Sequence, residues 1–346
     1  MPPRSRALML IALGIALAGF AREPLHEPVL KENFPDPHII KVGDRYIAYS
    51  TTTARRNVPV AVSSDLVQWS RLTDPAKPKQ LYDAMPTLPA WAGTGFTWAP
   101  EVLPVDGGYR LYFSAPHRTL KVQCIGVAAS TDPLGPFVPQ GSEPLVCQPE
   151  LGGTIDAHPF RDRDGQLYMY YKNDGNNPRF LKPAQIWAQR MAADGLRVTG
   201  PAVPLVSNDT HWEWRVVEAP TMVRHDGGYA LFFAANHFGW EADQRLSNYG
   251  TGYANCRGPM GPCQDADTKP WLGSYFDRAR GCLSGPGHGA VVHSGDQLYF
   301  AFHAWAASAG CRKLRDERYL YVAPLRFEAS KPVIGPSLRA RAGEAG

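Results

Sequence analysis

Five stretches of the chain repeat one pattern of apolar and polar positions. The first, residues 33–53 (NFPDPHIIKVGDRYIAYSTTT), reads as two short strands with alternating apolar residues, separated by a Gly-Asp turn. The pattern returns as TWAPEVLPVDGGYRLYFSA from Thr97, TIDAHPFRDRDGQLYMYYKND from Thr154, VEAPTMVRHDGGYALFFAAN from Val217 and GPGHGAVVHSGDQLYFAFHAW from Gly285. Each stretch predicts an antiparallel hairpin.

A tyrosine opens the second strand of every hairpin and shows the period. These residues are Tyr46, Tyr109, Tyr168, Tyr229 and Tyr299, at steps of 63, 59, 61 and 70 residues. Such steps exceed the ~40–45 residues of a WD-type blade, but they fit a four-stranded blade with longer loops. A third strand and a weaker fourth follow each hairpin. The sequence therefore predicts an all-β fold, a five-bladed β-propeller with four-stranded antiparallel blades around a central channel.

The ends of the chain differ from the repeats. Residues 1–21 combine Arg4 and Arg6 with an apolar run, as a secretion signal does. A membrane anchor is the rival interpretation, but the run is about 13 residues long and a span needs ~20. We expect a single propeller domain over residues 22–330, and an edge strand followed by a frayed tail over residues 331–346. This predicts a secreted or periplasmic protein without a membrane partner once the signal is removed.

Export changes the interpretation of the six cysteines, because an oxidising compartment favours disulfides. Proximity in sequence favours Cys124–Cys147, Cys256–Cys263 and Cys282–Cys311 among fifteen pairings. Zinc binding is disfavoured, since no C-x-x-C occurs. The net charge of +4 gives no indication of a nucleic-acid partner. The sequence leaves the oligomeric state open, and it lacks the G-x-S-x-G, H-E-x-x-H, P-loop and EF-hand motifs.

Polar residues stand where apolar ones would serve stability better. Ten to twelve residues before the five tyrosines lie Asp36, Trp98, Asp156, Glu218 and His288. In a propeller the first strand of each blade lines the channel, so we expect these side chains to meet at one end of it. Buried carboxylates are costly without partners. Two carboxyl groups suffice for glycoside hydrolysis, a third raises the pKa of the acid, and an aromatic face suits a sugar ring.

The same segments resemble the blade motifs of glycoside hydrolase family 43. The motifs are FPDPHIIKVGDRYIAYST, TWAPEV with GGYRLYFSA, IDAHPFRDRDGQLYMYYK, EAPTMVRHDGGYALFF, and GPGHGAVV with LYFAFHAW, across residues 28–327. The resemblance implies a five-bladed propeller that hydrolyses arabinan, arabinoxylan or related glycans with inversion.

Roles follow from the resemblance residue by residue. Asp36 would be the general base, Glu218 the general acid, and Asp156 the group that raises the pKa of Glu218 and orients it. The implied substrate contacts are Trp98, His288, His158 and Phe34. The chemistry would need no cofactor, although His288 matches a channel histidine that holds a water-ligated calcium ion in some members. This sequence departs from the family at His158, where a small residue is common, and at Gly289, where arabinan endo-hydrolases often carry Asn.

Structural roles compete with these interpretations. Asp36 and Asp156 would also suit turns beside proline, and Glu218 could pair with Arg215. Trp98 could fill the core, and His288 and His303 could be packed. Three tryptophans have two possible roles: they could flank a sugar groove, or they could serve only to pack the loops around the fourth repeat. They are Trp212, Trp214 and Trp240.

The expected activity is inverting hydrolysis that releases terminal α-L-arabinofuranosyl units, with the carboxyls of Asp36 and Glu218 ~6.5–9.5 Å apart. Long insertions at residues 73–95 and 236–280 could wall the site into a pocket. A β-xylosidase and a galactan hydrolase stay open, as does a glycan-binding propeller without turnover. The last would not need three carboxylates at one site.

Overall fold

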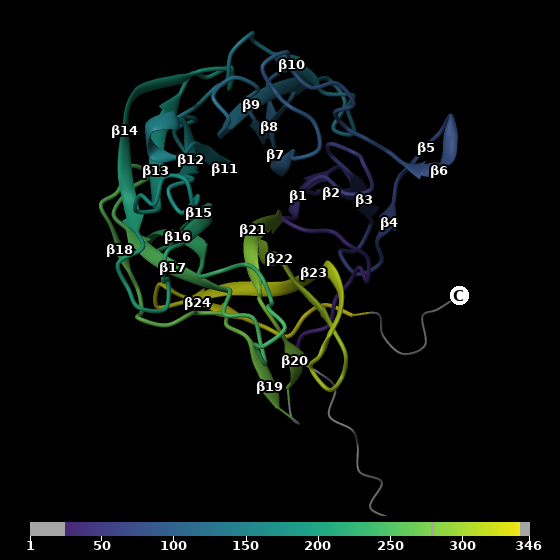
Figure 1. Ribbon diagram of the computed structural model, residues 1–346, viewed down its shortest axis with the longest axis vertical. Coiled ribbons are helices and arrows are strands. Elements are labelled where there is room, and N and C mark those ends of the chain that lie inside the picture. Colours follow the sequence, from purple (N-terminus) through teal and green to yellow (C-terminus); the bar gives the residue numbers. More distant parts are fainter. Residues whose placement is uncertain (1–24, 278–279, 340–346) are drawn as a thin grey trace, which may run out of the picture.

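The computed structural model describes residues 25–277 and 280–339, so the leader expected at residues 1–21 lies outside it. Five four-stranded antiparallel sheets stand in a ring around a centre (Figure 1). The predicted five-bladed β-propeller is confirmed. Within the described part of the chain, no helix is long and apolar enough to cross a membrane.

Each blade is a meander whose first strand lies nearest the centre (Figure 1). The strands, blade by blade, are β1 (His38–Val42), β2 (Arg45–Tyr49), β3 (Val60–Ser63) and β4 (Ser70–Arg71); β7 (Trp98–Val105), β8 (Gly108–Pro116), β9 (Gln123–Ser130) and β10 (Val138–Gln140); β11 (Thr154–Arg161), β12 (Leu167–Asn173), β13 (Gln185–Met191) and β14 (Val198–Ser207); β15 (Val217–His225), β16 (Gly228–Ala235), β17 (Gly250–Cys256) and β18 (Cys263–Asp265); and β21 (Gly287–Ser294), β22 (Gln297–Ala307), β23 (Lys313–Glu328) and β24 (Lys331–Ile334).

Smaller elements lie between or outside the blades. They are the hairpins β5 (Thr73–Asp74) with β6 (Lys77–Leu81) and β19 (Tyr275–Asp277) with β20 (Gly281–Leu283), and a 3₁₀ turn at Pro149–Leu151. Strand β24 pairs with β23, so the fifth blade continues past residue 330. The three expected disulfides, Cys124–Cys147, Cys256–Cys263 and Cys282–Cys311, are confirmed.

The apolar core is divided among the five junctions between neighbouring blades. Each junction buries one cluster of side chains, drawn from the facing sheets. The junction of the fifth and first blades closes the ring. There Val292 and Ala301 pack with Ile39 and Tyr46, and Leu30 bridges to Leu320. Because apolar burial is the main favourable term in folding, this closure fixes the inner strands relative to one another.

Each inner strand begins with the same irregularity. The residues involved have φ between 45° and 59°, and they are Asp36, Ala99, Asp156, Ala219 and His288. In the last four blades a register shift accompanies it, with one residue more on the inner strand than on its partner, which is a β-bulge. Positive φ at a non-glycine residue costs about 1–3 kcal/mol, and such strain concentrates at functional sites.

The neighbouring blade satisfies the backbone at these bulges. The N–H of Ala99 donates to Thr51 Oγ1 at 2.8 Å, and the N–H of Asp156 donates to Ser114 Oγ at 3.1 Å. The N–H of Ala219 donates to Asp156 Oδ2 at 2.9 Å, and the N–H of Asp36 donates to His303 Nδ1 at 3.1 Å. In all four cases the acceptor belongs to the preceding blade. Buried N–H groups need such partners, so the bulges join the blades around the ring.

The departure at Gly289 has a steric cause. A Cβ atom built on Gly289 would lie 2.0 Å from Cζ of Phe300, which is fully buried between β22 and its neighbours. The Phe300 ring therefore occupies the space that a side chain at position 289 would need.

We expect Gly289→Ala to destabilise the protein by about 1–3 kcal/mol, because the core around Phe300 must shift to accept the methyl group. Urea unfolding measures the change. Gly310→Ala is the control, since the atom nearest to its Cβ would be 3.9 Å away, and its effect should stay within about 0.5 kcal/mol. Equal stability of the two variants would contradict this packing argument.

Candidate active site

The bulges surround a pocket of about 460 Å³ at the centre of the ring. The side chains that line it include all three carboxylates expected from the sequence, and they are Asp36, Thr51, Phe96, Trp98, Ile155, Asp156, Lys172, Asp174, Asn176, Asn177, Pro178, Glu218, Phe238, Tyr249, His288 and Arg318. Four of the five blades contribute a charged or histidine side chain to this pocket. Convergent polar groups in one concave site are the usual mark of an active site.

Asp36 is surrounded by positive and hydrogen-bonding groups. Its Oδ1 lies 3.0 Å from Arg318 Nη1, 3.2 Å from His303 Nδ1 and 3.5 Å from His288 Nδ1. Its Oδ2 accepts a hydrogen bond from Thr51 Oγ1 at 2.5 Å. Burial alone would raise the pKa of Asp36, but Arg318 first and then His288 outweigh it and hold this pKa well below its usual value. Burial lowers the pKa of His303 to about 4, so His303 is neutral and accepts the Asp36 N–H at Nδ1. Asp36 is therefore ionised at neutral pH.

Two side chains hold the Glu218 carboxylate, and neither was among the site residues expected from the sequence. Its Oε2 accepts from Lys172 Nζ at 2.9 Å, and its Oε1 accepts from the Tyr249 hydroxyl at 2.7 Å. Burial opposes ionisation of Glu218, yet Lys172 and Tyr249 prevail, and its pKa is lowered. The surface pair with Arg215 considered above does not form, because Arg215 lies over the Trp214 ring instead.

Asp156 has the opposite environment. Burial raises its pKa to about 7, and the nearby charges of Glu218 and Asp36 add to the effect against His288 and Lys172. Asp156 therefore holds a proton at higher pH than Glu218 does, and near neutral pH the proton favours Asp156 over Glu218. The sequence led us to expect this proton on Glu218.

A second polar layer lies deeper in the channel, two residues further along the inner strands. Glu101 Oε2 is 2.8 Å from His158 Nδ1 and 3.5 Å from His38 Nε2. His158 is buried and does not line the pocket. It neither narrows the pocket nor adds a ligand there, because its ring is held by Glu101.

The deeper layer of the channel has few of the ligands that calcium prefers. Calcium takes six to eight oxygen ligands, whereas the layer below the pocket offers histidine nitrogens and one carboxylate, Glu101, that His38 and His158 already contact. Within residues 25–277 and 280–339, no channel group brings three carboxylate, histidine or cysteine ligand atoms within 4.8 Å of one another. The donor set does not fit direct coordination of calcium, and a water-ligated ion at His288 stays a prediction.

The remaining expected residues divide between pocket and core. Trp98 and His288 line the pocket. Phe34 is fully buried and packs under the guanidinium of Arg71, so it cannot touch a substrate in this conformation.

The expectation that Asp36, Trp98, Asp156, Glu218 and His288 occupy equivalent positions in their blades was wrong. Trp98 and Glu218 come one residue before the positive-φ position, which Ala99 and Ala219 occupy. A count back from tyrosine misses this because the hairpins differ: the third blade has a longer hairpin loop, and Tyr299 lies one residue further from its turn than Tyr109 and Tyr229 do.

Several pocket residues were missed from the sequence: Lys172, Tyr249, Arg318 and Thr51. Lys172 gave a signal, since it is a charge that directly follows the apolar strand LYMYY and is fully buried. Tyr249 and Arg318 gave none, because both lie outside the repeated hairpins. Of the long insertions, residues 236–249 contribute Phe238 and Tyr249 to the pocket, and residues 73–95 contribute nothing to its lining.

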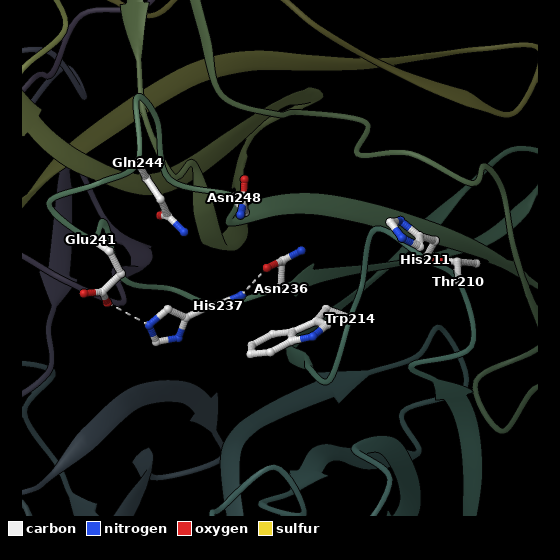
Figure 2. A pocket seen from close by; sticks show the side chains of 8 residues that line it. All are labelled: Thr210, His211, Trp214, Asn236, His237, Glu241, Gln244 and Asn248. Carbon is white, nitrogen blue, oxygen red and sulfur yellow. Dashed lines mark hydrogen bonds and ion pairs between the residues drawn. The ribbon is translucent and has the colours of Figure 1, made fainter.

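A second hollow of about 580 Å³ adjoins the first along this insertion. His237 and Asn248 line it, and the next residues in the chain, Phe238 and Tyr249, line the central pocket. Figure 2 shows the Trp214 ring beside His237, whose Nε2 lies 3.2 Å from Glu241. Trp214 is 55% exposed, whereas Trp212 stacks on Phe233 and Trp240 is buried. We call this hollow the outer pocket.

Comparisons with known proteins agree on one family. The model for glycosyl hydrolases family 43 matches residues 25–329. An extracellular endo-α-(1→5)-L-arabinanase of Bacillus subtilis (strain 168) is 25% identical over 309 residues, 78% of this chain and 59% of that protein. A non-reducing end α-L-arabinofuranosidase of Bacteroides ovatus is 23% identical over 340 residues, 93% of this chain and 55% of that protein. The chain spans little more than half the length of these two relatives.

Solved structures add the same family and fold. A thermostable family-43 glycoside hydrolase is 28% identical, with a TM-score of 0.74 over 90% of this chain and 96% of that one. An endo-1,4-β-xylanase from Bacteroides thetaiotaomicron is 27% identical, with a TM-score of 0.69 over 91% of this chain and 100% of that one.

The environment of Asp156 predicts a pH-dependent stability. Its pKa is higher in the folded chain than in the unfolded one, so its ionisation weakens the fold as the pH rises from about 4 through about 7. Asp156→Asn should therefore stabilise the protein more at about pH 8 than at about pH 5, with a difference of about 2–3 kcal/mol. Urea unfolding at both values measures this. A constant difference would show that Asp156 ionises equally in both states.

Proposed function

Because the chain belongs to glycosyl hydrolases family 43, we propose that it is an inverting glycosidase that releases α-L-arabinofuranosyl units from arabinan or arabinoxylan. The observation that carries this proposal is the pair of opposite carboxyl environments in one pocket. Asp36 is kept ionised by Arg318, while Asp156 and Glu218 share a proton. Glycoside hydrolysis by inversion requires one ionised carboxylate as base and one proton-bearing carboxyl as acid.

In the proposed mechanism Asp36 removes a proton from a water molecule that attacks the anomeric carbon. Arg318 and Thr51 hold Asp36 by one interaction with each carboxylate oxygen, which fixes the direction in which the base faces. Glu218 donates a proton to the glycosidic oxygen as the bond to the leaving sugar breaks. The proton taken from water ends on Asp36, and the proton of Glu218 ends on the departing alcohol. Asp36 then loses its proton to solvent and the Asp156–Glu218 pair regains one, which restores the starting state.

Glu218 can act as acid only when it carries the proton that rests on Asp156 in the unliganded protein. We place the transfer from Asp156 to Glu218 after substrate binding, when the substrate has displaced water from the pocket. Lys172 stays beside Glu218 throughout and stabilises the carboxylate that remains after donation. Asp156 thus gives its proton to Glu218. Once ionised, its negative charge raises the pKa of Glu218 and keeps the proton there until it is donated to the substrate.

The choice of arabinofuranosyl substrates is supported by two of the relatives, which are named an arabinanase and an arabinofuranosidase. The similar xylanase structure keeps xylosides as the second candidate, and galactan is the third. A glycan-binding propeller without turnover is less well supported, since binding alone does not need three buried carboxylates at one site. We also propose that the chain is exported, as its leader and disulfides suggest and as the Bacillus relative's name states for that protein.

The outer pocket is proposed to hold further sugar units of a polymeric substrate. It adjoins the central pocket, and the exposed face of Trp214 offers a surface on which the apolar side of a sugar ring can stack. His211, Asn236 and Gln244 supply polar groups around it. A substrate chain that crosses both pockets would place its linkage beside Glu218.

Substrates with good and poor leaving groups distinguish the proposed acid, Glu218, from the proposed base, Asp36. Glu218→Ala should lose about 10²–10⁴ in kcat/KM on arabino-oligosaccharides but far less on p-nitrophenyl arabinofuranoside, because nitrophenolate departs without a proton. Asp36→Ala should lose about 10²–10⁴ on both substrates. Asp226→Ala, at an exposed turn on the same strand pair as Glu218, is the control.

Parallel assays on xylosides and galactosides identify the sugar. Glycan binding with no sugar released by the wild-type protein would overturn the enzyme in favour of the binding protein. Equal losses for Glu218→Ala on good and poor leaving groups would remove Glu218 from the role of acid.

Trp214→Ala tests the outer pocket. We expect KM for linear arabinan to rise about 5–10-fold, since the stacking contact is lost, while kinetics on p-nitrophenyl arabinofuranoside stay unchanged because that substrate ends in the central pocket. Val138→Ala, which removes an exposed apolar side chain on the outer strand β10, is the matched control. A rise in KM for both substrates would show that Trp214 acts on the central pocket instead.

A further inference from the structure

Three carboxylates meet beside the outer pocket, away from the proposed catalytic groups. Asp209 and Glu213 belong to the connection between β14 and β15, and Asp265 ends β18 of the fourth blade. One oxygen from each residue lies within 4.8 Å of the oxygens of the other two. Among the described residues, no Lys, Arg or His forms an ion pair with any of the three. The negative charge of this cluster is therefore uncompensated by protein cations.

Glu213 adds an observation that an exposed acidic cluster would not show. Its side chain is fully buried, with 0% of the residue exposed. Oε2 accepts a hydrogen bond from the Thr210 N–H at 2.9 Å, but Oε1 is buried and finds no N–H or hydroxyl donor. The hydroxyl Oγ1 of Thr210 is likewise buried without a partner. Burial and the neighbouring Glu213 raise the pKa of Asp265 to about 8, so without an ion these two carboxyls hold a proton between them. A buried carboxylate oxygen with no partner costs free energy, and a bound cation would remove that cost.

We propose that Asp209, Glu213 and Asp265 bind a hard divalent cation, calcium by preference. Calcium binds carboxylate, hydroxyl and water oxygens at 2.3–2.6 Å, so two ligands on opposite sides of the ion lie about 4.6–5.2 Å apart. The three oxygens all lie within 4.8 Å of one another, close enough to contact one ion together. Thr210 Oγ1 and water complete the coordination. All ligands are oxygen, which disfavours zinc and copper.

The cation joins two parts of the chain that lie far apart in sequence. It ties the connection that carries Asp209 and Glu213 to the edge of the fourth blade at Asp265. Trp214 directly follows Glu213, and its ring lines the outer pocket. Glu218 lies five residues after Glu213 on β15. The ion therefore fixes the backbone from which the outer pocket is built, without touching the proposed catalytic groups.

Terbium, which occupies calcium sites and emits when a nearby tryptophan is excited, is the direct probe, because Trp212 and Trp214 flank Glu213. The chelator-treated protein should show saturable sensitised emission that calcium displaces. Calcium at about 100 times its Kd should also raise Tm by about 4 °C over the chelated protein. Neither readout depends on catalytic activity.

Matched variants locate the ion. Glu213→Gln, Asp265→Asn and the exposed Asp209→Asn should each abolish the calcium-sensitive emission and the Tm shift. Asp267→Asn, which removes the same charge two residues from Asp265 on an exposed position, should keep both. The proposal is overturned if calcium has no effect on emission or Tm, or if the cluster variants bind as the wild-type protein does. In the first case a proton shared by Glu213 and Asp265 would hold the cluster together.

Discussion

A buried backbone N–H group that a bulge removes from its strand ladder has to find another acceptor. In this propeller the acceptor is a side chain from the blade before, as Thr51 is for Ala99 and Ser114 is for Asp156. The ring depends on this exchange, because it sets each inner strand at a fixed height relative to its neighbour. The same bulges turn Asp36, Asp156 and His288 into the pocket, so the contacts that join the blades also build the site.

The two aspartates of the pocket have opposite pKa shifts because their neighbours differ: the pKa of Asp36 is lowered and that of Asp156 is raised. Asp36 is as deeply buried as Asp156, but an arginine and two histidines surround it and a threonine hydroxyl donates to it. Asp156 accepts one backbone N–H and faces the charge of Glu218. Lys172 separates the pKa values of Asp156 and Glu218, because its ion pair with Glu218 lowers the pKa of Glu218 and not that of Asp156 to the same extent. Burial alone would have raised all three pKa values; Arg318 and Lys172 lower the pKa values of Asp36 and Glu218, and Asp156 alone keeps a raised one.

The features that repeat along the chain could be predicted from the sequence. The hairpins, the five blades and the three disulfides follow from alternation, spacing and proximity, and the three acids were found because they interrupt that pattern. Prediction from the sequence failed where hairpin lengths differ and where contacts cross between blades. Counting from the tyrosines assumes hairpins of equal length, but the third hairpin has a longer loop and Tyr299 lies further from its turn, so Trp98 and Glu218 were given the position that Ala99 and Ala219 hold. Phe34 was expected among the substrate contacts, yet its ring is fully buried beneath Arg71. Arg318 and Tyr249 reach the pocket from outside the repeats, where no local pattern identifies them.

The central claim is that Asp36 and Glu218 act on opposite sides of one glycosidic bond, with a water molecule beside Asp36. The stereochemistry of the first product tests this most directly, and proton NMR can follow it during hydrolysis before the sugar mutarotates. The account predicts that the newly released sugar has the anomeric configuration opposite to that of the substrate. Release with the same configuration would mean that a carboxylate attacks the sugar itself, and it would contradict the assignment of Asp36 as a base acting through water.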